Sequence, residues 1–292
     1  MYDEYREAGK ISKIVKKEVR PMLKDGAKVL DIAEFVEGKI QRLGGELAFP
    51  CNISINEIAA HYSPPIHDET TLGHGDYVTV DLGAHINGYI ADTAFTVRIG
   101  EEKDDIIKAS EEALKNAISM IKAGVNTADI GVRVEETIKE YGFKPIENLN
   151  GHKLAQNKLH EGVTVPNIAI EEGYTLKDGD VFAIEPFATD GAGRAINQSK
   201  VFIFKYLGDR PIRLKIARRV LRDIRKNYPN LPFAERWLSK RIRGGKLEFA
   251  LKLLMKKNII YSFNVLEDEK KGSVTQSEHT VIVKKDGCEV TT

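Results

Sequence analysis

Two pairs of segments in the first half of the chain carry apolar residues at the spacing of amphipathic helices. In the clearest of them, Ile32, Val36 and Ile40 recur every four residues and therefore lie on one face of a helix. Glycines follow two of the segments, at the position where helices commonly end. The pattern predicts helices at residues 2–23, 29–43, 104–123 and 128–141.

Short runs rich in β-branched and aromatic residues follow each helix pair and predict strands. The remaining helical spacing is confined to one later stretch, which predicts an α+β fold with a helical insertion between strands. We expect strands at 53–60, 77–83, 89–99, 181–185, 197–206, 259–265 and 279–283, and insertion helices at 212–227, 232–242 and 246–257. The corresponding domains are residues 1–207 with 258–292, and an inserted basic helical subdomain at 208–257.

The two helix pairs resemble each other when the chain is shifted by 98 residues. Six of fourteen positions are then identical, among them Ile40 with Ile138 and Gly44 with Gly142. Helical patterning alone produces some such matches, but a true duplication predicts two α+β halves. These halves would pack sheet against sheet with their helices outside, leaving a cleft between related elements, where ligands commonly bind.

Composition narrows the class of protein. The chain has 292 residues, 42% of them hydrophobic, with 44 Lys and Arg against 43 Asp and Glu. The apolar runs are too short to cross a bilayer, the N-terminus lacks a secretory pattern, and two cysteines make no disulfide framework. We therefore expect a soluble protein of the cytoplasm.

The nearly neutral total conceals an uneven distribution of charge. Residues 210–257 hold 16 Lys and Arg and 3 Asp and Glu, so the rest of the chain is acidic. Such a stretch is either a solvated helical face or a surface that docks on nucleic acid such as ribosomal RNA.

Asp81 and Asp92 are the most informative polar residues. Each lies in a predicted strand, and Asn87-Gly88 between them is a hairpin turn signal. The parity of the pairing puts both carboxylates on one face, opposed or offset by one diagonal step. They repel by roughly 4 kcal/mol at about 4 Å and an effective dielectric constant of about 20. A bound cation, Arg or Lys partners, or exposure to solvent could each relieve this repulsion.

Three further polar residues stand out because of their apolar surroundings. Glu185 is the single acid in the run from Val181 to Phe187, and a buried glutamate requires a partner. His152 follows Asn150-Gly151, and Glu278 precedes the last predicted strand. Taken singly, each is compatible with a surface residue or a satisfied core group, and no short zinc signature is present.

Taken together and in this order, these residues resemble the methionine aminopeptidases of the second type, in their short archaeal form. The resemblance covers essentially the whole chain. It rests on the segments Asp81-Leu82-Gly83 with Asp92, Asn150-Gly151-His152, Ile184-Glu185-Pro186-Phe187 and Gln276-Ser277-Glu278-His279-Thr280. It implies the duplicated pita-bread (creatinase/aminopeptidase-like) fold. The 93 residues from Glu185 to Glu278 resemble the insertion of the second type.

The resemblance implies a dinuclear metal site that hydrolyses peptides. Asp92 and Glu278 would bridge two divalent ions, Asp81 would chelate one, and His152 with Glu185 would complete the other. Oxygen-rich ligands suit Co²⁺, Mn²⁺ or Fe²⁺, with Zn²⁺ as a further option. A water that bridges the ions would attack the scissile carbonyl, and Glu185 corresponds to the proposed general base.

His61 and His160 match the two active-site histidines of the family, which interact with the substrate. By family position, Phe49, Leu159 and Phe187 are candidate walls of a methionine pocket, and Tyr261 or Phe263 would complete it. His67, His74, His85 and His279 receive no role. The loop at 265–271 is more highly charged than the family suggests.

The resemblance thus predicts a monomeric aminopeptidase that removes the initiator methionine from nascent polypeptides, favouring a small second residue. The basic stretch would contact the ribosome. Two alternatives remain: a proline-specific peptidase of the same fold, and a non-catalytic relative that binds ribosomes or RNA. Proline-specific relatives usually carry an extra N-terminal domain, whereas only 80 residues precede Asp81.

Overall fold

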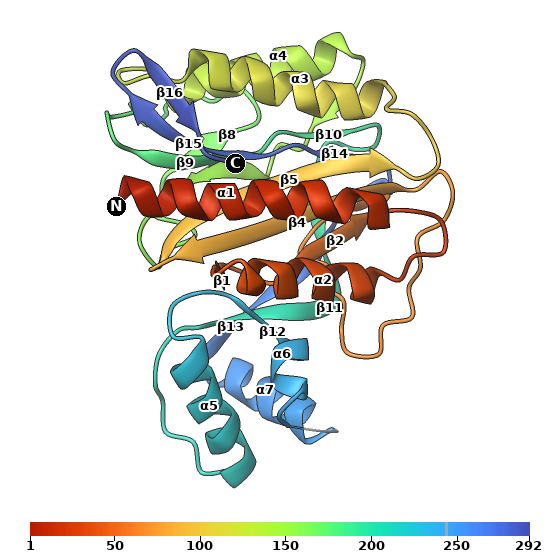
Figure 1. The fold of residues 1–292 in the computed structure, drawn as a ribbon, viewed down its shortest axis with the longest axis vertical. Helices are drawn as coiled ribbons and strands as arrows, with labels where there is room; N and C mark the ends of the chain where they lie inside the picture. Colours follow the sequence, from red (N-terminus) through yellow and green to blue (C-terminus); the bar gives the residue numbers. More distant parts are fainter. Residues whose placement is uncertain (243–244) are drawn as a thin grey trace.

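The helices of the main body agree closely with the predicted segments. A computed structural model of the chain describes residues 1–242 and 245–292 (Figure 1). The first helix ends in a 3₁₀ turn that contains Pro21. The side chains of Asp104 and Asn126 cap the N-termini of the third and fourth helices. These elements are α1 (Tyr2–Val19), η1 (Arg20–Met22), α2 (Val29–Arg42), α3 (Asp105–Met120) and α4 (Thr127–Glu140).

The strands form four small antiparallel sheets. Six of the seven predicted strands appear as single strands, and the run at 53–60 is split in two by a turn at Asn56, whose φ is +53°. The first sheet holds β1 (Glu46–Leu47), β2 (Asn52–Ile55), β4 (Tyr77–Ile86) and β5 (Tyr89–Arg98), and the second holds β6 (Lys144–Pro145), β10 (Phe187–Thr189) and β14 (Val274–Gln276). The third holds β3 (Ile58–Ala60), β11 (Ala195–Tyr206), β12 (Phe233–Ala234) and β13 (Ile260–Asp268), and the fourth β7 (Asn150–Lys153), β8 (Thr164–Pro166), β9 (Val181–Ile184), β15 (His279–Lys284) and β16 (Gly287–Val290).

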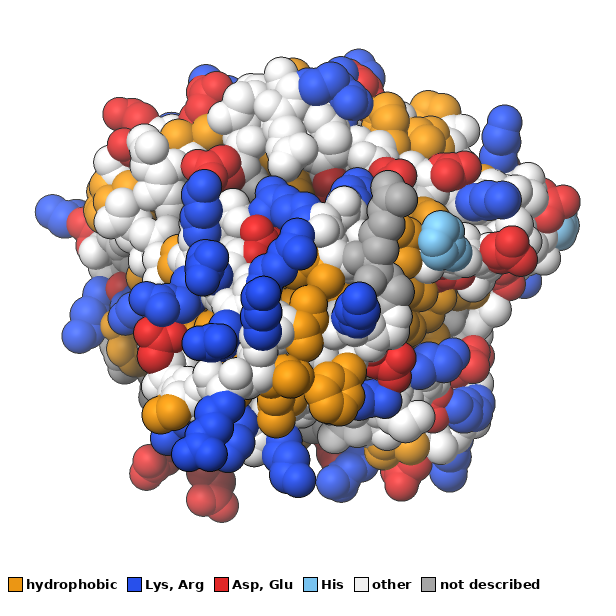
Figure 2. All heavy atoms as spheres, turned by 90° about the horizontal axis from the view of Figure 1, so that it is seen from below, with side chains coloured by type: hydrophobic (Ala, Val, Ile, Leu, Met, Phe, Trp, Pro, Cys, Tyr) orange, Lys and Arg blue, Asp and Glu red, His pale blue; other side chains and the backbone are white. Residues whose placement is uncertain are grey.

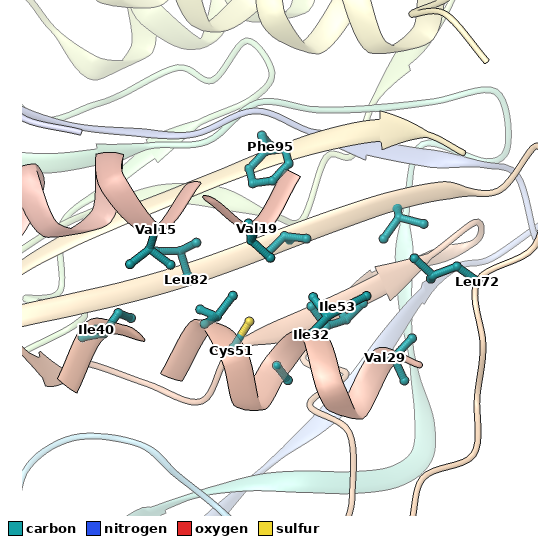
Figure 3. Packing of buried hydrophobic residues seen from close by; sticks show 14 of the residues in the cluster. Val15, Val19, Val29, Ile32, Ile40, Cys51, Ile53, Leu72, Leu82 and Phe95 are labelled. Atoms are coloured by element: carbon teal, nitrogen blue, oxygen red, sulfur yellow. The ribbon is translucent and has the colours of Figure 1, made fainter. Parts of the chain in front are cut away.

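Each helix pair covers its own set of strands. Val15 and Val19 of α1 and Ile32 of α2 pack on Ile53 and Leu82 of the first sheet, as Figure 3 shows. The second pair, α3 and α4, packs in the same way on β8, β9, β10 and β15. Burial of these apolar faces explains why the helical periodicity was so clear in the sequence.

The predicted duplication has a counterpart in the backbone hydrogen bonds. Helices α2 and α4 begin and end 98 residues apart, and each is followed by a glycine with φ above +80°. Ahead of each helix, Gly26 and Gly124 donate to the carbonyls of Leu72 and Leu176, at 2.8 Å in both halves.

A short segment after each of these leucines repeats as well. Its aspartate, Asp76 or Asp180, accepts a hydrogen bond from the backbone N–H three residues earlier. Five residues beyond each aspartate lies a predicted ligand, Asp81 in one half and Glu185 in the other. In both halves a strand begins directly after the aspartate, and the acid is the fifth residue from that start, inside β4 for Asp81 and just beyond the end of β9 for Glu185.

The two halves meet where β5 lies beside β14 and β15. Thr280 Oγ1 accepts from the backbone N–H of Asp92 and donates to its carbonyl, both at 2.8 Å. Thr96 Oγ1 exchanges an equivalent pair of bonds with the backbone of Gln276, both at 2.9 Å. Threonine hydroxyls thus complete the backbone bonding along this seam.

The later basic stretch packs around a separate apolar core at one end of the molecule (Figure 1). It contains α5 (Lys215–Asn227), α6 (Glu235–Ser239) and α7 (Lys246–Lys256). The prediction for 232–242 was partly wrong, because Phe233 and Ala234 pair with β11 before α6 begins. Among the described residues, each helix is too short or too polar to span a membrane.

The charged segment at 265–271 is not a loop throughout, because β13 continues to Asp268. The Asp268 carboxylate is fully buried and accepts hydrogen bonds from the backbone N–H groups of Ala192, Gly193 and Lys270. These bonds satisfy the charge, so that a sequence rich in acids and lysines is accommodated at the end of a strand.

Candidate metal centre

The β4–β5 hairpin positions the first two candidate ligands. Asn87 and Gly88 both have positive φ, at 52° and 85°, so the strands pair without a register shift. Asp92 lies opposite Gly83 and Asp81 opposite Ala94, which puts the two carboxylates on the same face, offset by one diagonal step. This is one of the two arrangements that the hairpin parity allowed.

The other three candidate ligands come from the second half of the chain. His152 lies in β7 and pairs with Ala183 of β9, while Glu185 follows β9 directly. His152 Nε2 lies 3.6 Å from Asp92 Oδ2 and 3.4 Å from Glu185 Oε1. Glu278 lies between β14 and β15, and ligand atoms of Asp92, His152 and Glu278 are within 4.8 Å of one another.

Burial determines the electrostatics of this cluster. It raises the pKa of Asp81 to about 7 and the pKa values of Asp92, Glu185 and Glu278 well above their ordinary range, the last three with help from neighbouring carboxylates. Burial, and then the neighbouring His160, lowers the pKa of His152 well below that of free imidazole. A neutral imidazole and closely spaced carboxyl groups form a set of metal donors.

Of the three ways to relieve the carboxylate repulsion, two find no support. Within residues 1–242 and 245–292, none of the four carboxylates forms an ion pair with Lys or Arg. Solvent gives little relief, because Asp92 is 3% exposed and the Oδ1 atom of the half-buried Asp81 is itself shielded from water. Asp81 Oδ1 and Asp92 Oδ1 are buried without a hydrogen-bond partner in that part of the chain. A divalent cation fits this set of oxygens and one nitrogen.

Two amides beside the carboxylates received no role from the sequence. Asn52 Nδ2 donates to Asp81 Oδ2 at 3.0 Å, and Gln276 Nε2 lies 3.3 Å and 3.2 Å from oxygens of Glu185 and Glu278. Gln276 is two residues before Glu278, so a search for amides near each acid could have found it. Asn52 reaches Asp81 only through the pairing of β2 with β4.

His61 and His160 line the same cavity as the five candidate ligands. His61 has a φ of +67°, and its Nδ1 lies 3.0 Å from the carbonyl oxygen of Asn264. The His160 ring is 4.2 Å from the His152 ring, centroid to centroid. Burial lowers the pKa of His61, so its imidazole is neutral at pH 7. The His160 side chain is more exposed than that of His61. Across the described residues, none of the other histidines lines this cavity.

The apolar part of the cavity contains the three predicted wall residues. Phe49 and Leu159 belong to one cluster of buried residues and Phe187 to another, and all three line a space of about 280 Å³. Phe263 also lines it, whereas Tyr261 is 54% exposed and does not. Ile203 and Pro232 are lining residues that the sequence did not indicate, because they come from strand β11 and the insertion.

The chain is similar to known metallopeptidases over nearly its whole length. The family model for metallopeptidase family M24 matches residues 3–285. The methionine aminopeptidase of Thermococcus onnurineus is 54% identical over 286 residues, covering 98% of this chain and 97% of the relative. That of Pyrococcus abyssi is 50% identical, covering 99% of each.

Solved structures share the fold at lower identity. A thermophilic Arx1 superposes with a TM-score of 0.86 at 17% identity, covering 99% of this chain and 89% of that one. The methionine aminopeptidase of Thermotoga maritima has a TM-score of 0.73 at 22% identity, covering 99% and 95%. These likenesses show that the pita-bread fold expected from the sequence is correct.

The family match extends over nearly the whole chain and includes both halves that contribute to the metal centre. Metallopeptidases use divalent metal ions, which agrees with the donor set described above. With half of all residues identical to proteins of matching length, the chain belongs to metallopeptidase family M24 and, within it, to the methionine aminopeptidases.

Proposed function

We propose that this enzyme removes the N-terminal methionine from newly made polypeptides, with a preference for a small second residue. The observation that carries the proposal is the convergence of four carboxylates, none of them paired with Lys or Arg among the described residues, and a neutral imidazole beside an apolar pocket. The names of relatives of matching length support methionine as the residue that is released.

The proposed ligands are Asp81, Asp92, His152, Glu185 and Glu278. By the family resemblance, Asp92 and Glu278 would be the ligands shared by two ions, and they are the two buried members of the four carboxylates. Co²⁺, Mn²⁺ and Fe²⁺ suit these donors best, with Zn²⁺ as a further option. When bound, the ions supply Lewis acidity that makes a water nucleophilic near neutral pH. Glu185 would hold the proton that this water gives up.

The two histidines differ in what they can offer the substrate. A carbonyl oxygen only accepts hydrogen bonds, so His61 Nδ1 carries its hydrogen toward Asn264, and Nε2 of the neutral ring is an acceptor. We therefore propose that His61 orients the substrate peptide by accepting a hydrogen bond from one of the N–H groups of that peptide. His160 remains to donate to the scissile carbonyl as negative charge develops on its oxygen.

The methionine side chain would occupy the apolar part of the cavity between Phe49, Leu159 and Phe187, beside Phe263. The proposed site needs no residue from a second subunit, and a monomer is the proposed state of the enzyme. The 93 residues from Glu185 to Glu278 support assignment to the second type, with residues 208–257 as an inserted subdomain of the enzyme.

A ribosome that carries nascent chains is the proposed partner, and the cytoplasm therefore the proposed location. Figure 2 shows the face that includes the insertion, where Lys and Arg side chains gather. In the described part of the chain, six exposed basic residues on and beside α5 form no ion pair: Arg213, Lys215, Arg218, Arg219, Arg222 and Lys226. Such a surface is complementary to the phosphates of ribosomal RNA.

A release assay on three peptides tests the proposal. Chelated protein should be inactive, and added Mn²⁺ or Co²⁺ should restore release of methionine from Met-Ala-Ser but much less from Met-Leu-Ser. Release of alanine from Ala-Pro-Ser would instead favour a proline-specific peptidase. Binding to ribosomes without hydrolysis of any of the peptides would favour a non-catalytic relative.

A further inference from the structure

The backbone at His61 has an unusual conformation that its neighbours must maintain. Its φ of +67° lies in the left-handed region, which residues other than glycine seldom adopt. Such a conformation persists only where the surrounding structure holds it in place. Two bonds lie close by: His61 Nδ1 to the Asn264 carbonyl, and the Ile53 N–H to the carbonyl of Tyr62, at 2.8 Å.

The segment that follows His61 is held by a residue of the insertion. Arg236 Nε donates to the carbonyl of Pro64 at 2.8 Å, and its Nη2 lies 3.4 Å from Ser63 Oγ. Arg236 is only 1% exposed, so these bonds form away from water. A guanidinium presents its donors in one rigid plane, which suits it to fixing several acceptors at once.

The same guanidinium is itself held on its other side by Glu37 of α2. Nη1 and Nη2 donate to the two carboxylate oxygens at 2.7 Å and 2.9 Å. Glu37 also accepts from the indole N–H of Trp237 and from the backbone N–H of Cys51. The buried ion pair therefore joins α2, the insertion and the segment after His61.

We propose that Arg236 is a positioning residue, which acts through Ser63 and Pro64 to keep His61 in its left-handed conformation and its imidazole in the cavity. The inference rests on the proposed role of His61 in orienting the substrate. It gives the insertion a part in catalysis that is separate from any contact with the ribosome.

A double-mutant cycle separates this role from a merely structural one. Arg236→Lys keeps the charge but cannot reproduce the four bonds, so we expect kcat/KM on Met-Ala-Ser to fall about tenfold or more, with metal content unchanged. In a His61→Ala background the same substitution should cost nothing further. Arg241→Lys, at an exposed ion pair of the insertion, is the matched control and should leave kcat/KM unchanged.

Losses that multiply in the double mutant, or an Arg236→Lys enzyme as active as the wild type, would overturn the inference. Glu37→Gln removes the charged partner of the guanidinium while nearly keeping the volume of the Glu37 side chain. If Arg236→Lys does not fold, Glu37→Gln replaces it in the double-mutant cycle. Wild-type protein that releases no methionine would count against the proposed function instead. Circular dichroism at the assay temperature ensures that only folded protein is compared.

Discussion

Burial opposes the ionisation of each of the four carboxylates at the metal centre, and neighbouring carboxylates add to this effect at Asp92, Glu185 and Glu278. Without a metal, burial and mutual repulsion favour the protonated forms. Bound protons then remove part of the negative charge that a metal cation would otherwise neutralise. The Asn52 and Gln276 amides stabilise only some of the oxygens. Metal-free enzyme should therefore respond to pH in a way that the metal-bound enzyme does not.

We expect the metal-free enzyme to lose stability as the pH rises from about 4 through 7. A carboxyl whose folded pKa is raised is favoured in the folded state at low pH, and this advantage disappears as the pH passes its folded value. Asp81, with a pKa raised from 3.8 to about 7, would contribute on the order of 4 kcal/mol to this loss.

Urea unfolding of chelated protein at several pH values measures the effect. Added Mn²⁺ should abolish most of the pH dependence, and Asp81→Asn should reduce it in the chelated protein. A free energy of unfolding that rises between pH 4 and 7 in chelated Asp81→Asn and wild type alike would contradict the prediction.

Some residues of this site could be predicted from the sequence pattern alone, and others could not. The shared face of Asp81 and Asp92 followed from hairpin parity, because both lie in one local unit. The roles of His152, Glu185 and Glu278 came only from the family resemblance. Arg236 was hidden, because its partners Glu37 and Pro64 lie about 200 and 172 residues away and nothing local distinguishes it from its basic neighbours.

Strand β4 illustrates how an element can serve the metal centre and the substrate pocket together. Asp81 projects to the metal centre, while Gly83 two residues later approaches the ring of Phe49 so closely that a Cβ would clash with it. The absence of a side chain at Gly83 therefore allows Phe49 to form a wall of the pocket.

Gly83→Ala should displace Phe49 and change the methionine pocket. We expect KM for Met-Ala-Ser to rise about tenfold or more and stability to fall by about 1–3 kcal/mol, with metal content retained. Gly287→Ala, where an added Cβ has no neighbour within 4 Å, is the control. Unchanged KM in a folded Gly83→Ala enzyme would show that Phe49 is not a wall of the pocket.

Long elements were predicted well and short ones were not. The four helices of the main body and strands β4, β5, β11 and β15 contain enough residues for their period to be recognised. Strands β1, β6 and β12 have two residues each, and their existence depends on partners such as β4, β10 and β11 from elsewhere in the chain. Pairing of this kind has no signature within the segment itself.

On the scale of the whole molecule, charge is separated between the acidic body and the basic insertion. The proposed metal ligands all lie outside residues 208–257, and the exposed basic residues of α5 lie within that range. In the proposed arrangement, the basic end binds ribosomal RNA while the metal centre receives the nascent chain.

Reversal of charge on α5 tests this arrangement. A triple variant, Arg218→Glu with Arg219→Glu and Arg222→Glu, should weaken cosedimentation with ribosomes and leave hydrolysis of Met-Ala-Ser unchanged, because phosphate contacts dominate such binding. Reversal at three exposed lysines of the body, Lys24, Lys122 and Lys285, is the matched control. Equal cosedimentation of both variants and the wild type would remove the insertion as the contact.

The seam between the halves has a consequence for how the molecule responds to metal. Asp81 and Asp92 come from one side of it, and His152, Glu185 and Glu278 from the other. Bound ions would link the two sides, and their binding energy would oppose separation. Backbone amide protons along β5 and β14 should then exchange with deuterium more slowly in loaded protein, while those on the far faces of α3 and α5 keep their rates.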